Sequence, residues 1–196
     1  ESFSSPILVD TRSEIAFSPR SANFRAWAAA FPQLAVGPDG QVSIIYVARP
    51  EARPTDDGDF FFTTSSDTGE SWSHPKRVND DDTSSFQFFP AVTYDPKGSI
   101  HVMWGDFRDD RNEKSYNIYY TKSEDGGKTW AENGRVSDFP SNPNRAFPGG
   151  RFIGDYFSIK ASEEDVYMVW ADGRLGEFGS SNQKIAYARA SLMPSP

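Results

Sequence analysis

The sequence predicts an all-β fold, a β-propeller of which three four-stranded antiparallel blades are visible. Two octapeptides, at residues 65–72 and 123–130, share the pattern S-x-D-x-G-x-[ST]-W. The segments that flank them repeat in the same order, and aromatic residues make up 15% of the chain, which favours pleated β surfaces. A unit of this length that recurs along the chain indicates a repeat architecture, even before its individual strands are assigned.

Each unit begins with an apolar strand that runs into a tight turn. These first strands are expected at residues 31–36, 89–94 and 156–160. The first two lead into Gly-Pro-Asp-Gly at residues 37–40 and Asp-Pro-Lys-Gly at residues 95–98. Proline fixes φ and glycine accepts a positive φ, so both tetrapeptides predict turns between two strands.

Three further strands complete each unit. The second strands alternate in the period of a half-buried sheet and are expected at residues 42–47, 100–104 and 166–170. The third strands are expected at residues 60–64, 118–122 and 185–189, and short fourth strands follow the octapeptides at residues 76–78 and 134–136. Such units repeated radially describe propeller blades. We place blade 1 at about residues 31–80, blade 2 at about 89–138 and blade 3 at about 155–190.

The two ends of the repeat array do not match. Residues 6–10 have the pattern of a fourth strand whose first three are missing, whereas blade 3 lacks a fourth strand, so this segment is a candidate for completing blade 3. Closed propellers use about 4–8 blades. The chain is therefore expected to form half of a six-bladed propeller and to need either a second copy or missing blades.

The octapeptides are expected to have a folding role. Aspartate can accept backbone hydrogen bonds in a turn, glycine permits an unusual backbone, and tryptophan supplies a large apolar body. A catalytic role is the weaker alternative. The positions concerned are Ser65, Asp67, Gly69, Trp72, Ser123, Asp125, Gly127 and Trp130.

A second recurring pattern, W-x-D-x-R, ends two of the second strands. It contains Asp106 and Arg108 in blade 2 and Asp172 and Arg174 in blade 3, while blade 1 offers Arg49 without the aspartate. If the blades are equivalent, the three arginines lie on one face, where they could bind an anionic ligand. The alternative is an Asp–Arg pair that attaches each blade to its loop.

Asp155 and Tyr156 interrupt the Phe-Pro pattern of the other first strands. First strands line the channel of a propeller, so both residues should lie near its mouth. Asp155 as acid/base, with Tyr156 as nucleophile or sugar-stacking ring, is one hypothesis. A turn-capping Asp155 beside a half-buried Tyr156 is the other.

No cofactor is expected, and Ca²⁺ is the metal that the chain could bind. Acidic clusters at residues 80–82 and at Asp106, Asp109 and Asp110 offer the oxygen ligands that Ca²⁺ prefers, without EF-hand spacing. Solvated loop carboxylates are the competing interpretation. Cysteine is absent and the two histidines are isolated, so no zinc site is expected.

The net charge of −8 argues against a nucleic-acid partner, which needs lysine and arginine. No apolar run is long enough for a membrane span. Acidity, a composition rich in Ser, Asp and Asn, and a first residue other than Met favour an extracellular or cell-surface location.

The octapeptides resemble the Asp-boxes, or bacterial neuraminidase repeats, of the sialidase superfamily. The chain is most similar to extracellular sialidase-like repeat proteins, which share the Phe-Pro first strand, the W-x-D-x-R strand end and the Phe-Ile-Gly-Asp-Tyr segment found at residues 152–156. The resemblance implies a propeller of sialidase type with its boxes on the rim, away from the central site.

In sialidases, three arginines bind the substrate carboxylate, a tyrosine paired with a glutamate attacks the sugar, and an aspartate is the acid/base. The family's Arg-Ile-Pro motif is absent, since Arg25 is followed by Ala26 and Trp27. Two functions remain open. One is a secreted carbohydrate-directed propeller that hydrolyses terminal sialic or related acidic sugars; the other is a non-catalytic module for binding or surface assembly. Convergence of the arginines with Asp155 and Tyr156 in one pocket would favour the enzyme.

Overall fold

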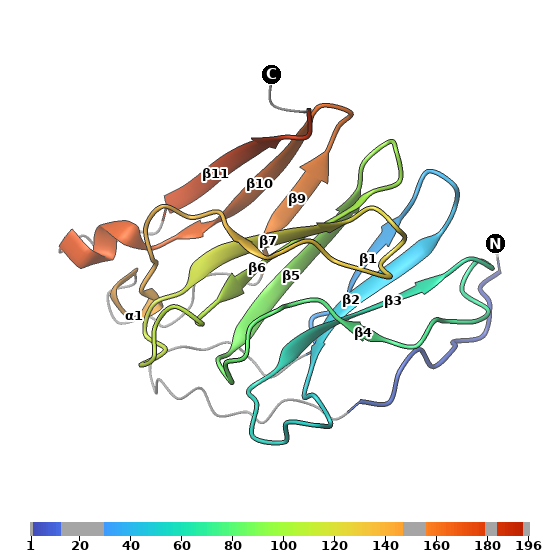
Figure 1. Ribbon diagram of the computed structural model, residues 1–196, viewed down its shortest axis with the longest axis horizontal. Coiled ribbons are helices and arrows are strands. Elements are labelled where there is room, and N and C mark those ends of the chain that lie inside the picture. Colours follow the sequence, from blue (N-terminus) through green and yellow to red (C-terminus); the bar gives the residue numbers. More distant parts are fainter. Residues whose placement is uncertain (1, 13–29, 147–155, 179–183, 194–196) are drawn as a thin grey trace.

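The computed structural model describes residues 2–12, 30–146, 156–178 and 184–193, and it confirms the all-β propeller architecture (Figure 1). Three antiparallel sheets follow one another along the chain. The first sheet, blade 1, has the order β1 (Gln33–Val36), β2 (Val42–Ala48), β3 (Asp59–Ser65) and β4 (Lys76–Arg77). The second, blade 2, has the order β5 (Gln87–Tyr94), β6 (Ile100–Asp106), β7 (Asn117–Ser123) and β8 (Gly134–Arg135).

Blade 3 contains three strands among the described residues. They are β9 (Ser158–Ala161), β10 (Asp165–Asp172) and β11 (Lys184–Ser191), with β10 in the middle. Two short helices lie in the connections, α1 (Pro143–Ala146) and a 3₁₀ turn, η1 (Arg174–Phe178). The predicted turns close as expected, because Gly37 N–H donates to Gln41 O at 2.8 Å and Asp95 N–H donates to Ser99 O at 3.0 Å. The turns that follow β1, β5 and β9 lie at the same edge of the molecule (Figure 1).

The blades pack face to face and share their cores. We call the face of a blade that looks toward the preceding blade its front face, and the opposite face its back face. The core between blades 1 and 2 is built from Ile45, Val47, Phe60, Phe62, Val78, Ile100, Val102, Trp104 and Tyr119. The core between blades 2 and 3 includes Phe88, Phe89, Met103, Tyr116, Ile118, Phe157, Ile159, Val166, Met168 and Trp170. Because strand side chains alternate, blade 2 contributes one face to each core.

Aromatic rings meet where the inner strands β1, β5 and β9 begin. The ring of Phe89 packs edge-on against Phe31 at 5.1 Å between centroids and against Phe157 at 5.5 Å. Phe31 and Phe89 have φ of 41° and 52°, which a bulky side chain rarely adopts. Phe31 and Phe89 each precede a proline. Their contact with Phe157 joins three consecutive blades near the start of the inner strands.

Residues 6–10 do not complete blade 3 within this chain. They form no strand, and the segment lies against blade 1, where the Tyr46 hydroxyl donates to the Asp10 carboxylate. The Arg12 guanidinium lies over the Phe61 ring at 4.2 Å. These contacts anchor the segment on the front face of blade 1, at the opposite end of the molecule from β11 (Figure 1).

Candidate functional site

The first octapeptide forms a closed turn around the Asp67 carboxylate. Ser65 Oγ donates to Asp67 Oδ1 at 2.6 Å, and Ser71 donates from its backbone N–H to Oδ1 at 2.9 Å and from its hydroxyl to Oδ2 at 2.5 Å. Trp72 Nε1 donates to Gly69 O at 3.1 Å. The hydrogen bonds from Ser65 and Ser71 hold the pKa of the Asp67 carboxyl well below its ordinary value. Asp67 is thus a fixed hydrogen-bond acceptor.

The second octapeptide repeats this geometry. Ser123 Oγ donates to Asp125 Oδ1 at 2.8 Å and accepts from Gly127 N–H at 2.9 Å. The backbone N–H groups of Lys128 and Thr129 both donate to Asp125 Oδ1 at 2.9 Å, and Thr129 Oγ1 donates to Oδ2 at 2.6 Å. The hydroxyl and amide of Thr129 lower the pKa of the Asp125 carboxyl in the same way.

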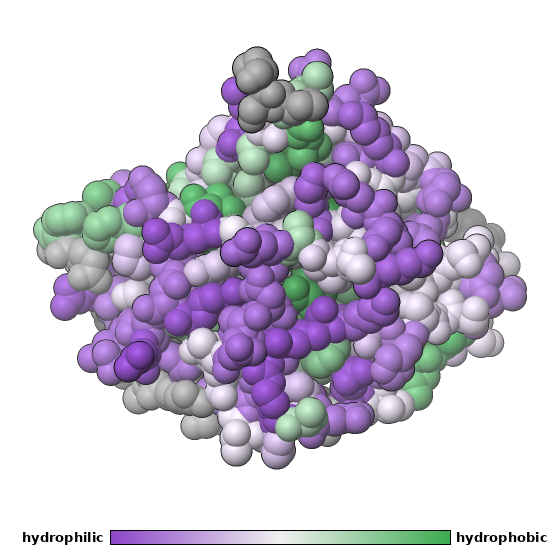
Figure 2. Space-filling model, viewed as in Figure 1, coloured by the Kyte–Doolittle hydropathy of each residue, from purple (hydrophilic) through white to green (hydrophobic). Residues whose placement is uncertain are grey.

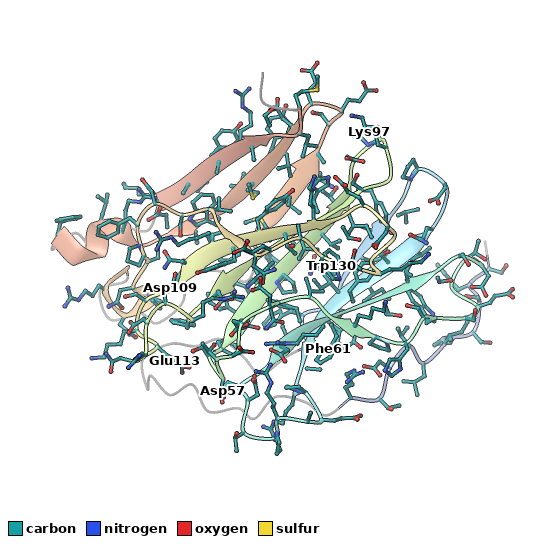
Figure 3. The ribbon with its side chains drawn as sticks, viewed as in Figure 1. Asp57, Phe61, Lys97, Asp109, Glu113 and Trp130 are labelled. Carbon is teal, nitrogen blue, oxygen red and sulfur yellow. The ribbon has the colours of Figure 1, made fainter. Side chains whose placement is uncertain are left out.

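The tryptophan of the second octapeptide joins two blades. Trp130 packs edge-on against Phe62 of blade 1 with 5.1 Å between ring centroids, and Figure 3 shows it between the two sheets. Gly127 approaches the same ring so closely that a Cβ atom would lie 2.2 Å from Phe62 Cε1. The octapeptide of blade 2 therefore helps to hold blade 2 against blade 1.

Asp106 and Arg108 of blade 2 form a buried ion pair. Arg108 donates to Asp106 from its backbone N–H at 2.8 Å and from Nε at 2.9 Å, and its Nη1 lies 2.8 Å from Asp80 Oδ1. The guanidinium also stacks over the Tyr119 ring at 4.3 Å. Burial raises the pKa of Asp106 to about 6, while Arg108 and Trp104 act in the opposite direction.

Asp172 and Arg174 of blade 3 repeat the arrangement. Arg174 donates to Asp172 from its backbone N–H at 2.8 Å and from Nε at 2.7 Å, and its Nη2 lies 2.8 Å from Asp138 Oδ1. The two arginines thus bind carboxylates of their own blade and of the segment that precedes it. They are the same structural feature in successive blades.

Arg49 does not occupy the equivalent position in blade 1. The last pair of the second and third strands is Ala48 with Asp59 in blade 1 and Asp106 with Asn117 in blade 2, so Ala48 is the equivalent of Asp106. Arg49 follows Ala48 by one residue, whereas Arg108 follows Asp106 by two. Blade 1 instead uses Arg53, whose Nη2 donates to Asp59 Oδ2 at 2.6 Å. The sequence did not predict this, because Arg53 lies in a loop of different length and outside the W-x-D-x-R pattern.

Further carboxylates surround Arg108 and Arg77 at the boundary of blades 1 and 2. Asp59 accepts from Asn79 Nδ2 at 2.7 Å and lies 2.8 Å from Arg77 Nε. Asn79 also donates to Asp81 at 2.7 Å, which lies 3.3 Å from Arg108. Asp59 begins β3, Asn79 and Asp81 follow β4, and Arg108 follows β6, so no single local motif marks the cluster.

Apart from the exposed Asp82, the acidic residues considered for Ca²⁺ have other partners. Asp80 and Asp81 bind Arg108, and Asp109 accepts from Tyr119 and Asn117. Asp110 caps a turn by accepting from three backbone N–H groups, at Asn112, Lys114 and Ser115. Across the described part of the chain, no group of three or more acidic, histidine or cysteine side chains is arranged to hold a metal ion.

Tyr156 lies two residues before β9 and exposes 78% of its surface. It borders an open groove of about 460 Å³ on blade 3, together with Phe157, Ser158, Val169 and Lys184. Asp155, its predicted catalytic neighbour, lies outside the described residues, as does Arg25. Within the described residues, neither Arg108 nor Arg174 lines this groove.

His101 is a buried residue that the sequence gave no reason to select. Its Nδ1 lies 2.8 Å from the Tyr120 hydroxyl and its Nε2 lies 3.3 Å from Asp95 Oδ2. Burial lowers the pKa of His101, so the ring is neutral at pH 7. His101, Tyr120 and Asp95 together link the turn after β5 to the back face of blade 2.

Solved structures of carbohydrate-active propellers share this fold. An α-L-arabinanase of Penicillium chrysogenum complexed with arabinobiose is 17% identical, with a TM-score of 0.62 over 93% of this chain and 51% of that chain. An α-L-arabinofuranosidase of Fusarium graminearum in complex with arabinobiose is 16% identical, with a TM-score of 0.62 over 91% of this chain and 50% of that chain. A microbial sialidase matches less well, with 17% identity and a TM-score of 0.46 over 72% of this chain and 32% of that chain.

The chain spans about half the length of the two arabinan-directed structures. At this identity the likeness shows the fold alone. No protein-family model matches the sequence, and no curated protein matches it. Among the described residues, no helix has the length and apolar character needed to cross a membrane.

Proposed function

We propose that the chain is part of an extracellular, carbohydrate-directed propeller that binds a glycan where its inner strands begin. The observation that carries this proposal is the exposed ring of Tyr156, which directly precedes Phe157 of the aromatic contact that Phe31, Phe89 and Phe157 form. A tyrosine offers an apolar ring face and a polar hydroxyl, which suits a sugar that has both kinds of surface.

The ion pairs of the W-x-D-x-R segments favour a neutral sugar over an acidic one. Arg108 and Arg174 are each bound to two or more carboxylates, so their charge is already compensated. An arginine clamp for a substrate carboxylate requires guanidinium groups that are free to bind it. The complexes of the arabinan-directed propellers with arabinobiose support arabino-oligosaccharides as the first ligands to test.

Titration calorimetry with arabinobiose and with a sialoside tests the proposal. We expect heat of binding with arabinobiose, an affinity at least about tenfold weaker in Tyr156→Ala, and a smaller loss in Tyr156→Phe, which keeps the ring. Phe3→Ala is the matched control, because Phe3 is 95% exposed. If folded protein binds neither sugar, or if Tyr156→Ala binds as well as the wild type, the proposal fails.

Hydrolysis of a terminal sialic or related acidic sugar is the second candidate. Its support is the position of Tyr156, with Asp155 as the proposed acid/base. A fluorogenic sialoside and a fluorogenic arabinoside, each assayed with Tyr156→Phe and Asp155→Asn beside the wild type, distinguish it from binding alone. Turnover that both variants abolish supports the enzyme; no turnover by folded protein excludes it.

A further inference from the structure

The back face of blade 3 is apolar and uncovered. Strand pairing relates three back-face positions in each blade. Where a following blade is present, these positions are mostly buried. In blade 1 they are Ile45, Phe60 and Phe62, each at most 2% exposed. In blade 2 they are Met103 and Ile118, both fully buried, and the partly buried Tyr120. The equivalents in blade 3 are Val169 37%, Ile185 84% and Tyr187 60% exposed. Figure 2 shows hydrophobic residues gathered over the β10–β11 end of an otherwise largely hydrophilic surface.

The outer edge of β11 is also unpaired among the described residues. In the first two blades a short fourth strand covers this edge, through the pairs Phe61 with Arg77 and Tyr119 with Arg135. The equivalent residue of β11 is Ala186, and its only strand partner in the structure is β10. An open edge of this kind can accept one more strand.

Residues 6–10 resemble such a fourth strand in sequence, and they precede blade 1 as the fourth strand of blade 1 precedes blade 2. Pro-Ile-Leu-Val-Asp at residues 6–10 matches Pro-Lys-Arg-Val-Asn at residues 75–79. In blade 1 this stretch places Val78 inside the core that blade 2 covers. Asp10 and Arg12 contact the front face of blade 1, just as Asp80 and Asp81 contact Arg108 on blade 2.

A charge pair matches across the two ends. Lys184 is the register equivalent of Asp59 and Asn117, and the sequence match makes Asp10 the equivalent of Asn79 and Ser137. Within the chain these positions bind each other, at 2.7 Å from Asn79 Nδ2 to Asp59 Oδ1 and at 2.9 Å from Ser137 Oγ to Asn117 Oδ1. At the open ends they are a lysine and an aspartate, which have opposite charges.

We propose that a second copy of this chain covers the back face of blade 3. Residues 6–9 of each copy pair with β11 of the other, with Leu8 opposite Ala186 and Ile7 opposite Tyr187. Asp10 of one copy then binds Lys184 of the other. The apolar back face of blade 3 packs on the open part of the other copy's blade 1 front face, where Leu34 is 61% and Val36 57% exposed. Tyr46 and Phe61 on the same face are already buried within the chain.

Two-fold symmetry explains why a second copy fits. The N-terminal segment and β11 lie at opposite ends of the described structure, so the two do not meet within these three blades (Figure 1). Two copies related by a two-fold axis satisfy both ends at once and leave no open edge. Two sets of three blades give about six, within the range of closed propellers.

Native mass and a charge exchange test this proposal. We expect twice the chain mass of 21.9 kDa for the wild type, and a dimer dissociation constant raised about tenfold or more in Asp10→Lys and in Lys184→Asp, because like charges then meet in both interfaces. The double variant restores opposite charges and should restore the dimer. A wild-type monomer, open-ended polymers, or a double variant weaker than both single variants would each overturn the proposal.

Cross-linking tests the register independently. The chain contains no cysteine, so Ile7→Cys with Tyr187→Cys introduces one defined pair. Mild oxidation should give a covalent dimer on a non-reducing gel, whereas the control pair Phe3→Cys with Tyr187→Cys should not. Equal cross-linking of both pairs would contradict the register. These measurements do not involve sugar, so their failure leaves the glycan proposal to its own test. Their success would mean that the second copy covers Val169, Lys184 and Ile185 of the groove beside Tyr156, so the sugar titration must then be made on the dimer.

Discussion

Gly40 and Gly127 have the same backbone angle, φ of 83°, in very different surroundings. A Cβ atom on Gly40 would meet nothing within 4 Å, whereas a Cβ atom on Gly127 would overlap the Phe62 ring. The two positions therefore separate the cost of an unfavourable backbone from the cost of a steric overlap.

Gly40→Ala should lower the free energy of unfolding by about 1–2 kcal/mol, the cost of a left-handed residue with a side chain. Gly127→Ala should cost about 1–3 kcal/mol more, because Phe62 lies in the core and cannot move freely. Urea denaturation of both variants measures the difference. Equal losses would show that the octapeptide of blade 2 does not press on Phe62.

Asp125 should make stability depend on acid pH. Its hydrogen bonds lower its pKa in the folded state, so folding favours the ionised form. That contribution is fully present above the unfolded pKa of about 3.9 and is lost as the pH falls below it. Asp125→Asn should therefore be less stable than the wild type at pH 7, with the difference shrinking below about pH 4. Thermal melts across this range measure it, and a constant difference would contradict the assignment.

At the scale of elements, the W-x-D-x-R segment attaches the end of a second strand to the preceding connection. Arg108 is 10% exposed and Arg174 31%, although the two make the same contacts with the aspartate two residues earlier. Both arginines lie on the front face of their blade, but Arg108 stacks on the Tyr119 ring, whereas the register equivalent of Tyr119 in blade 3 is Ala186.

Arg108→Met should cost about 3–5 kcal/mol at pH 7, because it leaves the Asp106 carboxylate buried without its cation. In the folded variant, the pKa of Asp106 then rises further above its value in the unfolded chain. The folded form therefore binds more protons, and the variant should regain stability as the pH falls from 7 to 5. Arg174→Met, the matched control, should lose less. Urea denaturation at both pH values measures this, and equal losses would contradict the role of burial.

The elements were predictable where the chemistry is local. Glycine and proline mark the turns, and the fixed spacing of serine, aspartate and tryptophan marks the octapeptides. Pairing across blades was not predictable, because contacts such as Arg108 with Asp80 depend on how loops of unequal length meet. For the same reason Arg49 was aligned with Arg108, although strand register separates them, and His101 gave no sign of its contact with Tyr120.

At the scale of the whole molecule, stability depends on cores that belong to two blades at once. Phe88 of β5 is fully buried and its ring contacts Phe107 and Tyr116 of its own blade and Phe157 of the next. In the described part of the chain, the two largest cores each draw on residues of two blades, so the blades should unfold in one transition.

Phe88→Ala should lower the free energy of unfolding by about 3–5 kcal/mol, the range for a large aromatic removed from a close-packed core. Trp104 reports on the boundary of blades 1 and 2, and Trp170 on that of blades 2 and 3, so tryptophan fluorescence and far-ultraviolet circular dichroism should show the same shifted midpoint. Phe3→Ala is the control at an exposed site. Two separated transitions, with one tryptophan environment lost before the other, would show instead that the blades fold as independent units.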